Sequence, residues 1–205
     1  MSWIYSTINL YEPIDATSIL RKIEYAGRTC YRSFDKQTDS IEDTIRFVTN
    51  AISRGHESIL EHISLSFVVI CSRDVLAQWT RHRLASYSVE SQRYCNYTKD
   101  KFNGFYFIMP ENTTDDMQAE IIQAITEDVQ HYENLIALGA KPEQARSILP
   151  NCTKTEFVWT ANLREIRHFI KLRTANGAQA DIVKLAKQLK LLLEENGLGA
   201  IVQDL

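Results

Sequence analysis

The spacing of hydrophobic positions changes several times along the chain between a helical and a strand pattern. Apolar residues three and four positions apart predict helices over 16–27, 40–55, 73–83, 112–138, 162–174 and 179–195, with a short one over 141–149. Alternating or continuous apolar runs predict strands over 4–10, 62–70, 105–109 and 154–160. The sequence therefore predicts an α+β fold, or a mixed α/β one, with a mixed sheet flanked by helices and one long helical segment.

Signals for the ends of these helices agree with the pattern. Asp39 and Glu42 have the spacing of a capping box ahead of the helix over 40–55, and Gly55 is expected to close it. Gly139 and Gly197 are expected to end two later helices in the same way. The 205 residues contain no repeat, low-complexity tract or obvious linker, so we expect one domain over 1–205.

Composition excludes several classes of protein. Lysine and arginine total 23 against 26 for aspartate and glutamate, so the chain lacks the basic surplus of a protein that binds long nucleic acids. The N-terminus has no signal-peptide pattern, and no apolar stretch approaches a membrane span. The four cysteines are scattered without a C-x-x-C pair, which predicts neither a zinc ribbon nor a disulfide framework. We expect a soluble protein of the reduced cytoplasm, with no partner membrane or nucleic acid.

One arginine falls on the apolar side of its predicted helix. At about 100° per residue, Arg173 lies between Ile166 and Phe169. The opposite half of the wheel contains the other cationic side chains: Arg164, Arg167, His168 and Lys171. A guanidinium on the apolar side needs an anion or acceptors, because removing it from water costs several kcal/mol.

A second arginine has the same placement if its helix is long enough. Arg83 lies among the apolar residues of the helix over 73–83, while Gln78 and Arg81 share the neighbouring polar face. Either arginine alone could reach water from a helix end. Two of them, followed by the serines of "SYSVESQR", favour a small phosphate-bearing ligand, although no G-x-G-x-x-G or P-loop motif is present.

No metal site is predicted. His56 and His62, with Glu57 and Glu61 between them, are six residues apart and lack the i, i+4 spacing of an H-E-x-x-H motif.

The run from 81 to 93 resembles the signature of the flavin-dependent thymidylate synthases. That signature is R-H-R, seven residues, S, one residue, R, and the chain has Arg81-His82-Arg83, then "LASYSVE", then Ser91-Gln92-Arg93. The segments "GHESILEH", "ARSILP" and "FVWTANLREIRHFIKLR" resemble further family segments in the family's order. Two positions depart from the family pattern, with Ser88-Val89 in place of Asn-Glu and Gly177 in place of a frequent histidine.

The resemblance implies an enzyme that converts dUMP to dTMP, with FAD, NADPH and 5,10-methylenetetrahydrofolate, in a homotetramer whose subunits share active sites. It implies FAD contacts from one set of residues: Ser58, Arg81, His82, Arg83, Asn162, Arg164 and His168. It implies dUMP contacts from a second set: Gln78, Arg81, Glu90, Ser91, Gln92, Arg93 and Arg146. Arg173 is expected to face the pyrimidine imide, and His56 to lie near the flavin ring.

The chemistry of these residue types is compatible with that role. A fixed cation beside the uracil imide stabilises negative charge that develops when C5 becomes nucleophilic, and Arg173 suits this task. The catalytic candidates are thus Arg173, Ser91 and His56. Ser91 has no obvious base near it in sequence, so we expect it to donate a hydrogen bond rather than act as a nucleophile.

Other interpretations remain at this stage. Asn162 with Glu165 is also a good N-cap pair. The arginines and tyrosines could belong to an RNA-binding module, which the acidic net charge disfavours, and the fold could serve a nucleotide-binding protein without catalysis.

Overall fold

The chain forms two compact units that do not follow one another in sequence. The computed structural model describes residues 1–205, apart from the side chain of Asp100. Unit 1 comprises Met1–Thr7, Val69–Arg81 and Ser88–Phe157, and unit 2 comprises Ile8–Val68, His82–Tyr87 and Val158–Leu205. The prediction of a single domain over 1–205 stays a prediction.

Two sheets contain the strands. The larger has the order β2 (Thr7–Leu10), β3 (Ser64–Ser72), β6 (Lys154–Asn162) and β4 (Ala85–Val89). In the smaller, β1 (Ser2–Trp3) runs parallel to β5 (Tyr106–Phe107), with Ser2 opposite Tyr106. Each of β3, β4 and β6 contributes residues to both units. The helices and mixed strand pairings confirm the predicted α+β class.

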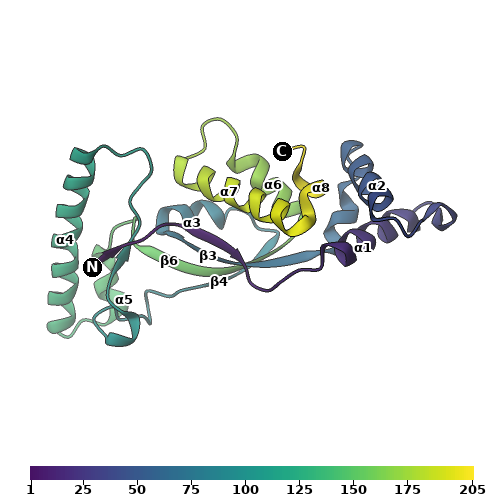
Figure 1. Ribbon diagram of the computed structural model, residues 1–205. Coiled ribbons are helices and arrows are strands. Elements are labelled where there is room, and N and C mark those ends of the chain that lie inside the picture. The colour runs from purple at the N-terminus through teal and green to yellow at the C-terminus, as the bar shows by residue number, and fades with distance from the viewer. The chain divides into compact units, whose positions relative to one another are not determined.

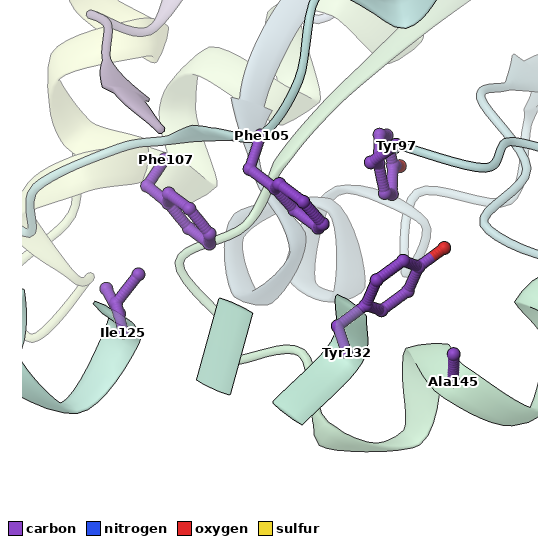
Figure 2. Packing of buried hydrophobic residues seen from close by; sticks show 6 residues of the cluster. All are labelled: Tyr97, Phe105, Phe107, Ile125, Tyr132 and Ala145. Carbon is purple, nitrogen blue, oxygen red and sulfur yellow. The ribbon is translucent and has the colours of Figure 1, made fainter. Parts of the chain in front are cut away.

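Unit 1 is built around the long helix α4 (Asp115–Ala137), which lies beside the short helix α5 (Pro142–Ala145) (Figure 1). Its remaining helical segments are α3 (Arg73–Trp79), η3 (Asp100–Phe102) and η4 (Arg146–Ile148). Figure 2 shows Phe105 and Phe107 directed towards Ile125 and Tyr132 of α4. The rings of Phe105 and Tyr132 meet edge to face at 5.1 Å, a favoured aromatic geometry.

Unit 2 contains α1 (Ala16–Thr29) packed on α2 (Ile41–Ser53), and α6 (Leu163–Arg173) packed on α7 (Ala180–Leu193) (Figure 1). Its shorter segments are η1 (Phe34–Lys36), η2 (Glu57–His62), the π-helical η5 (Glu194–Leu198) and α8 (Gly199–Val202). Phe67, Trp159 and Phe169 form an aromatic chain in its core, with ring centroids 5.6 and 5.3 Å apart. None of the helices in the described part of the chain is long and apolar enough to cross a membrane.

Glycines with a positive φ follow α2 and α4 as predicted, at Gly55 and Gly139, and Gly197 interrupts the helical backbone within η5. Gly55, after α2, has a positive φ, and the next amide, of His56, donates to the Ala51 carbonyl at 2.9 Å. Gly197 also has a positive φ, and a Cβ there would lie 2.9 Å from the Cβ of Ala16. Only glycine satisfies both conditions at position 197.

The predicted cap of α2 is wrong by one residue. Ser40, not Asp39, is the N-cap, and its hydroxyl accepts from the Asp43 amide at 3.2 Å. Ser40 also donates to Glu42 at 2.7 Å. The helix begins at Ile41, which puts Asp39 outside the position from which a side chain can cap it.

The helix predicted over 73–83 ends at Trp79, so the placement of Arg83 among apolar residues is wrong. Arg83 is exposed. The following segment contains the strand β4, which the apolar spacing did not predict. Tyr87 Oη donates to the His82 carbonyl at 2.6 Å, which occupies an acceptor that a continuing helix would use.

Two positions of α6 also differ from the helical wheel. Arg167, assigned to the polar half, is only 4% exposed, whereas Arg173, assigned to the apolar half, is only partly buried. Arg167 is buried because Asp204 accepts two hydrogen bonds from it, at 2.7 and 2.8 Å, and Glu57 accepts a third at 3.0 Å. Carboxylates that come from outside a helix are not visible in its own periodicity.

Candidate functional site

In unit 2, the middle residue of the R-H-R run is a buried link between α6 residues. His82 is 3% exposed, and its Nδ1 lies 3.0 Å from Oε1 of Glu165. Its Nε2 lies 3.0 Å from Nε of Arg173. We call Glu165, His82 and Arg173 the His82 cluster.

Burial favours the uncharged form of His82 in the His82 cluster. Removal from water lowers the pKa of His82, and the cation of Arg173 acts in the same direction, while the hydrogen bond to Glu165 opposes both. Burial also lowers the pKa of Arg173, which nevertheless remains a cation. Tyr87 lies at the edge of the cluster, and burial raises its pKa to about 12, so its hydroxyl stays protonated and donates.

The other three candidates at α6 are its N-cap and two side chains exposed to solvent. The Asn162 side chain accepts from the Glu165 amide at 2.9 Å, which confirms it as the N-cap. Arg164 is half exposed and is paired with Glu61 at 2.5 Å. His168 is exposed, with its ring 5.5 Å from that of His82.

A hollow of about 560 Å³ in unit 2 contains two further predicted residues. His56 and Ser58, both exposed, line it together with Arg54, Asn50 and Phe47. Arg164 reaches Glu57 and Glu61 in the same segment, η2. The hollow thus offers a hydroxyl, an imidazole and a guanidinium beside an aromatic ring.

In unit 1, the second half of the signature follows strand β4. Glu90 accepts from Lys154 Nζ at 2.7 Å and from Tyr97 Oη at 2.8 Å. Burial raises the pKa of Tyr97 far above its ordinary value, with the charge of Glu90 adding to it. Glu90 and Lys154 line a second hollow of about 380 Å³, together with several aromatic residues.

The next residues of the signature include an amide whose NH2 group is buried. Gln92 is 6% exposed, and its Nε2 has no hydrogen-bond partner among the described residues. Ser91 Oγ accepts from the Arg93 amide at 3.3 Å. Buried polar groups are normally satisfied, and the Gln92 amide shares this lack of a partner with several other buried atoms, including the indole nitrogens of Trp79 and Trp159.

Two exposed arginines of unit 1 lie near one carboxylate. Arg93 donates to Glu143 at 2.8 Å, and this bond lowers the pKa of Glu143, with a smaller effect from Arg146. Arg146 is exposed at the start of η4. Exposed ion pairs of this kind contribute little stability, so a dianion can replace the carboxylate.

The remaining residues assigned by the family resemblance lie in the first part of the signature or just before it. Arg81 and Arg83 are exposed, and Gln78 is half buried on α3.

Sequence reasoning missed the roles of Glu165, Lys154 and Tyr97. Glu165 carried a signal, since it occupies the third position of α6, but that signal indicated only a capping partner.

One group of metal-ligating side chains exists in the described part of the chain. Ligand atoms of His82, Glu165 and His168 lie within 4.8 Å of one another. However, Glu165 and Arg173 already occupy both ring nitrogens of His82, and a metal at Nε2 would meet a guanidinium. The geometry favours a hydrogen-bond network, and the absence of a metal stays a prediction.

Comparison with known proteins gives consistent matches over most of the chain. Residues 14–196 match the family described as "Thymidylate synthase complementing protein". A probable flavin-dependent thymidylate synthase of Mycobacterium phage L5 is 35% identical over 178 residues, 81% of this chain and 72% of that protein. The flavin-dependent thymidylate synthase of Pyrococcus furiosus is 32% identical over 195 residues, 93% and 79% of the two chains.

A solved structure shares the fold. The UMP/dUMP methylase PolB from Streptomyces cacaoi, crystallised with 5-Br dUMP, superposes with a TM-score of 0.79 over 98% of this chain and 96% of that one. The sequence identity is 21%, so this match concerns the fold alone.

Proposed function

The chain belongs to the flavin-dependent thymidylate synthase family, and from this premise we propose that it converts dUMP to dTMP by reductive methylation. 5,10-Methylenetetrahydrofolate is the proposed carbon donor, reduced FAD the hydride source, and NADPH the reductant that regenerates it. The family membership confirms the resemblance found in residues 81–93.

One observation carries the proposal: the Arg173 guanidinium is held by a neutral histidine. His82 accepts from Arg173 Nε and remains uncharged, so it fixes the cation without neutralising it. A partly buried cation of fixed orientation is what the uracil imide requires when negative charge develops on it. Arg173 is accordingly the proposed electrostatic catalyst, and its high pKa excludes it as the base.

The residues of unit 2 fit a flavin cofactor. The hollow beside His56 and Ser58 combines hydroxyl, imidazole and guanidinium donors with the ring of Phe47, a donor set suited to a phosphate-bearing aromatic group. Ser58, Asn162, Arg164 and His168 are the residues we assign to FAD in this unit. When bound, FAD supplies the hydride chemistry, and the protein supplies its position.

The residues of unit 1 fit the nucleotide. Arg93 and Arg146 lie near Glu143, an exposed carboxylate that a phosphate dianion can displace. The buried amide of Gln92 is suited to a carbonyl or hydroxyl of the ligand. No histidine or carboxylate in the described part of the chain is hydrogen-bonded to Ser91 Oγ, which supports a binding role for Ser91 rather than a nucleophilic one.

We further propose that the active protein is a homotetramer with active sites shared between subunits. In support, two large apolar side chains, Leu84 within the signature and Tyr94 directly after it, are each 73% exposed. Covering such side chains with another subunit would remove their apolar surface from water, which stabilises an assembly.

The deciding experiment follows the flavin and the product together. The purified protein is expected to keep flavin absorbance through gel filtration, or to take up added FAD, and to form dTMP from dUMP only when NADPH and methylenetetrahydrofolate are present. UMP is the control substrate, because the fold match includes a methylase that acts on UMP and dUMP.

Each other outcome selects a different function. Nucleotide binding without NADPH oxidation indicates a non-catalytic sensor. A colourless protein that takes up no FAD and binds RNA with a steep salt dependence indicates the RNA-binding alternative.

A further inference from the structure

Hydrogen-bond donors determine which nitrogen of His82 carries the proton. Arg173 Nε always bears a hydrogen, and it lies 3.0 Å from His82 Nε2, so that nitrogen is the acceptor. A neutral imidazole has one N–H, which must then be on Nδ1, and Glu165 Oε1 accepts it at 3.0 Å. The contacts thus require a single tautomer.

Apart from Glu165, the charged groups around His82 disfavour its doubly protonated, cationic form. An imidazolium would direct an N–H at the N–H of Arg173, and it would also lie near His168, whose ring is 5.5 Å away. Tyr87 on β4 remains a neutral hydroxyl that donates to the His82 backbone. Glu165 is the group that favours the Nδ1 proton.

The backbone of Glu165 is held in place independently of His82. The residue is 6% exposed, and its backbone amide donates to the Asn162 cap at 2.9 Å. The ring of Phe169 packs edge-on against His82 at 4.9 Å, which limits rotation of the imidazole. The start of the Glu165 side chain and the imidazole ring are therefore both restrained, and the Nδ1–Oε1 contact joins them.

We propose that Glu165 is a positioning residue for the reaction: by holding the Nδ1–H tautomer of His82 it makes Nε2 an acceptor, and that acceptor fixes the guanidinium plane of Arg173. The predicted effect of Glu165 on turnover rests on the proposed function. The assignment of the His82 tautomer does not depend on that function. In this arrangement the side chain of His82 acts within the protein, through Arg173, rather than as a flavin ligand.

The test is the substitution Glu165→Gln, which keeps the shape but lets the side chain donate as well as accept. The matched control is Asp204→Asn, which removes the carboxylate partner of another buried α6 side chain, Arg167. Selective ¹⁵N-histidine labelling reports protonation of each ring nitrogen, with His82 assigned from the signals lost in His82→Gln.

In the wild-type protein we expect His82 Nδ1 protonated and Nε2 unprotonated. In Glu165→Gln we expect the Nε2-protonated form to appear, and kcat for dTMP to fall roughly ten- to hundredfold, because displacements of about 1 Å carry costs of that size. The affinity for dUMP should change less than about threefold, since the phosphate contacts are on other residues. Asp204→Asn should leave the His82 signals unchanged and kcat within about twofold.

Several results would overturn the proposal. These are a protonated Nε2 in the wild-type protein, an unchanged tautomer and kcat in Glu165→Gln, or equal losses of kcat in Glu165→Gln and Asp204→Asn. The wild-type spectrum decides the tautomer even if Glu165→Gln does not fold. A wild-type protein with the expected tautomer but no dTMP formation would contradict the proposed function and leave the tautomer assignment intact.

Discussion

At the scale of single residues, cationic side chains differ in what holds them. Arg173 is bound by a neutral acceptor, whereas Arg93 and Arg164 are paired with the exposed carboxylates Glu143 and Glu61. The first arrangement preserves the net positive charge of the guanidinium, and the second leaves it available for exchange with a ligand anion. The proposed roles, imide stabilisation and phosphate binding, follow from this difference.

Arg173→Ala should nearly abolish dTMP formation, while Ser91→Ala should retain a measurable rate. The guanidinium stabilises charge that develops in the reaction, and loss of such a group typically lowers kcat about 10² to 10³-fold. Among the described residues no histidine or carboxylate is hydrogen-bonded to Ser91 Oγ, so its proposed contribution is a hydrogen bond only. Product formation over time measures both rates, and complete loss in both variants would reverse the order of importance.

At the same scale, the sequence placed Arg173 on the apolar side of α6, where it is partly buried, and misplaced Arg167, which is buried. Both lie on α6, and helical spacing predicted burial of Arg173 alone. Arg167 is buried because Asp204 and Glu57, 37 and 110 residues away in sequence, neutralise it. Partners at such separations, like the link from Glu165 to His82, exist only once the chain has folded.

At the scale of elements, the start of α6 combines two roles in one side chain. Asn162 caps the helix, and the family resemblance also assigns it to FAD. The apolar spacing predicted every long helix. The capping signals predicted the Asn162 cap and the breaks in helical backbone at Gly55 and Gly197. The apolar spacing did not predict β4, because alternation in "ASYSV" is weak and the strand depends on pairing within the sheet.

Two substitutions separate the roles of Asn162. Asn162→Ala should lower the free energy of unfolding by about 1 kcal/mol, the usual cost of a lost N-cap. Asn162→Asp keeps a capping oxygen and should retain that stability, but its charge should weaken FAD binding if the FAD phosphates lie there. Urea denaturation and flavin titration measure the two effects, and unchanged FAD affinity in Asn162→Asp would assign the residue to capping alone.

At the scale of the whole molecule, the C-terminal end is attached to α6 and η2 through one guanidinium. Arg167 bonds the Ile201 carbonyl, Asp204 and Glu57. The hydrogen bonds from Arg167 lower the pKa of Asp204 below its ordinary 3.8. This contribution to stability is therefore present above pH 3.8 and is lost as the pH falls below it.

Asp204→Asn should destabilise the protein at pH 7 by about 1 kcal/mol, a modest value because Asp204 is half exposed. The difference from wild type should narrow as the pH falls below 3.8, because the wild-type carboxyl becomes neutral first in the unfolded chain and, at lower pH, also in the folded protein. Urea midpoints at pH 7 and pH 3 provide the measurement. Glu120→Gln, at an exposed position of α4, serves as the control and should show no such convergence.

The proposed homotetramer gives a further prediction. Size-exclusion chromatography with light scattering should report about 94 kDa, four times the 23.6 kDa of one chain. Because shared sites require neighbouring subunits, activity per chain should fall when dilution dissociates the assembly. A fully active monomer would rule out shared sites.

The division of the chain between its two units limits which fragments of the protein can fold by themselves. The signature enters unit 2 at His82 and returns to unit 1 at Ser88, and β3 and β6 cross the same boundary. No continuous fragment therefore encodes either unit, and neither can be cloned, swapped or lost as a module. A frameshift within the signature should remove strands from both units at once.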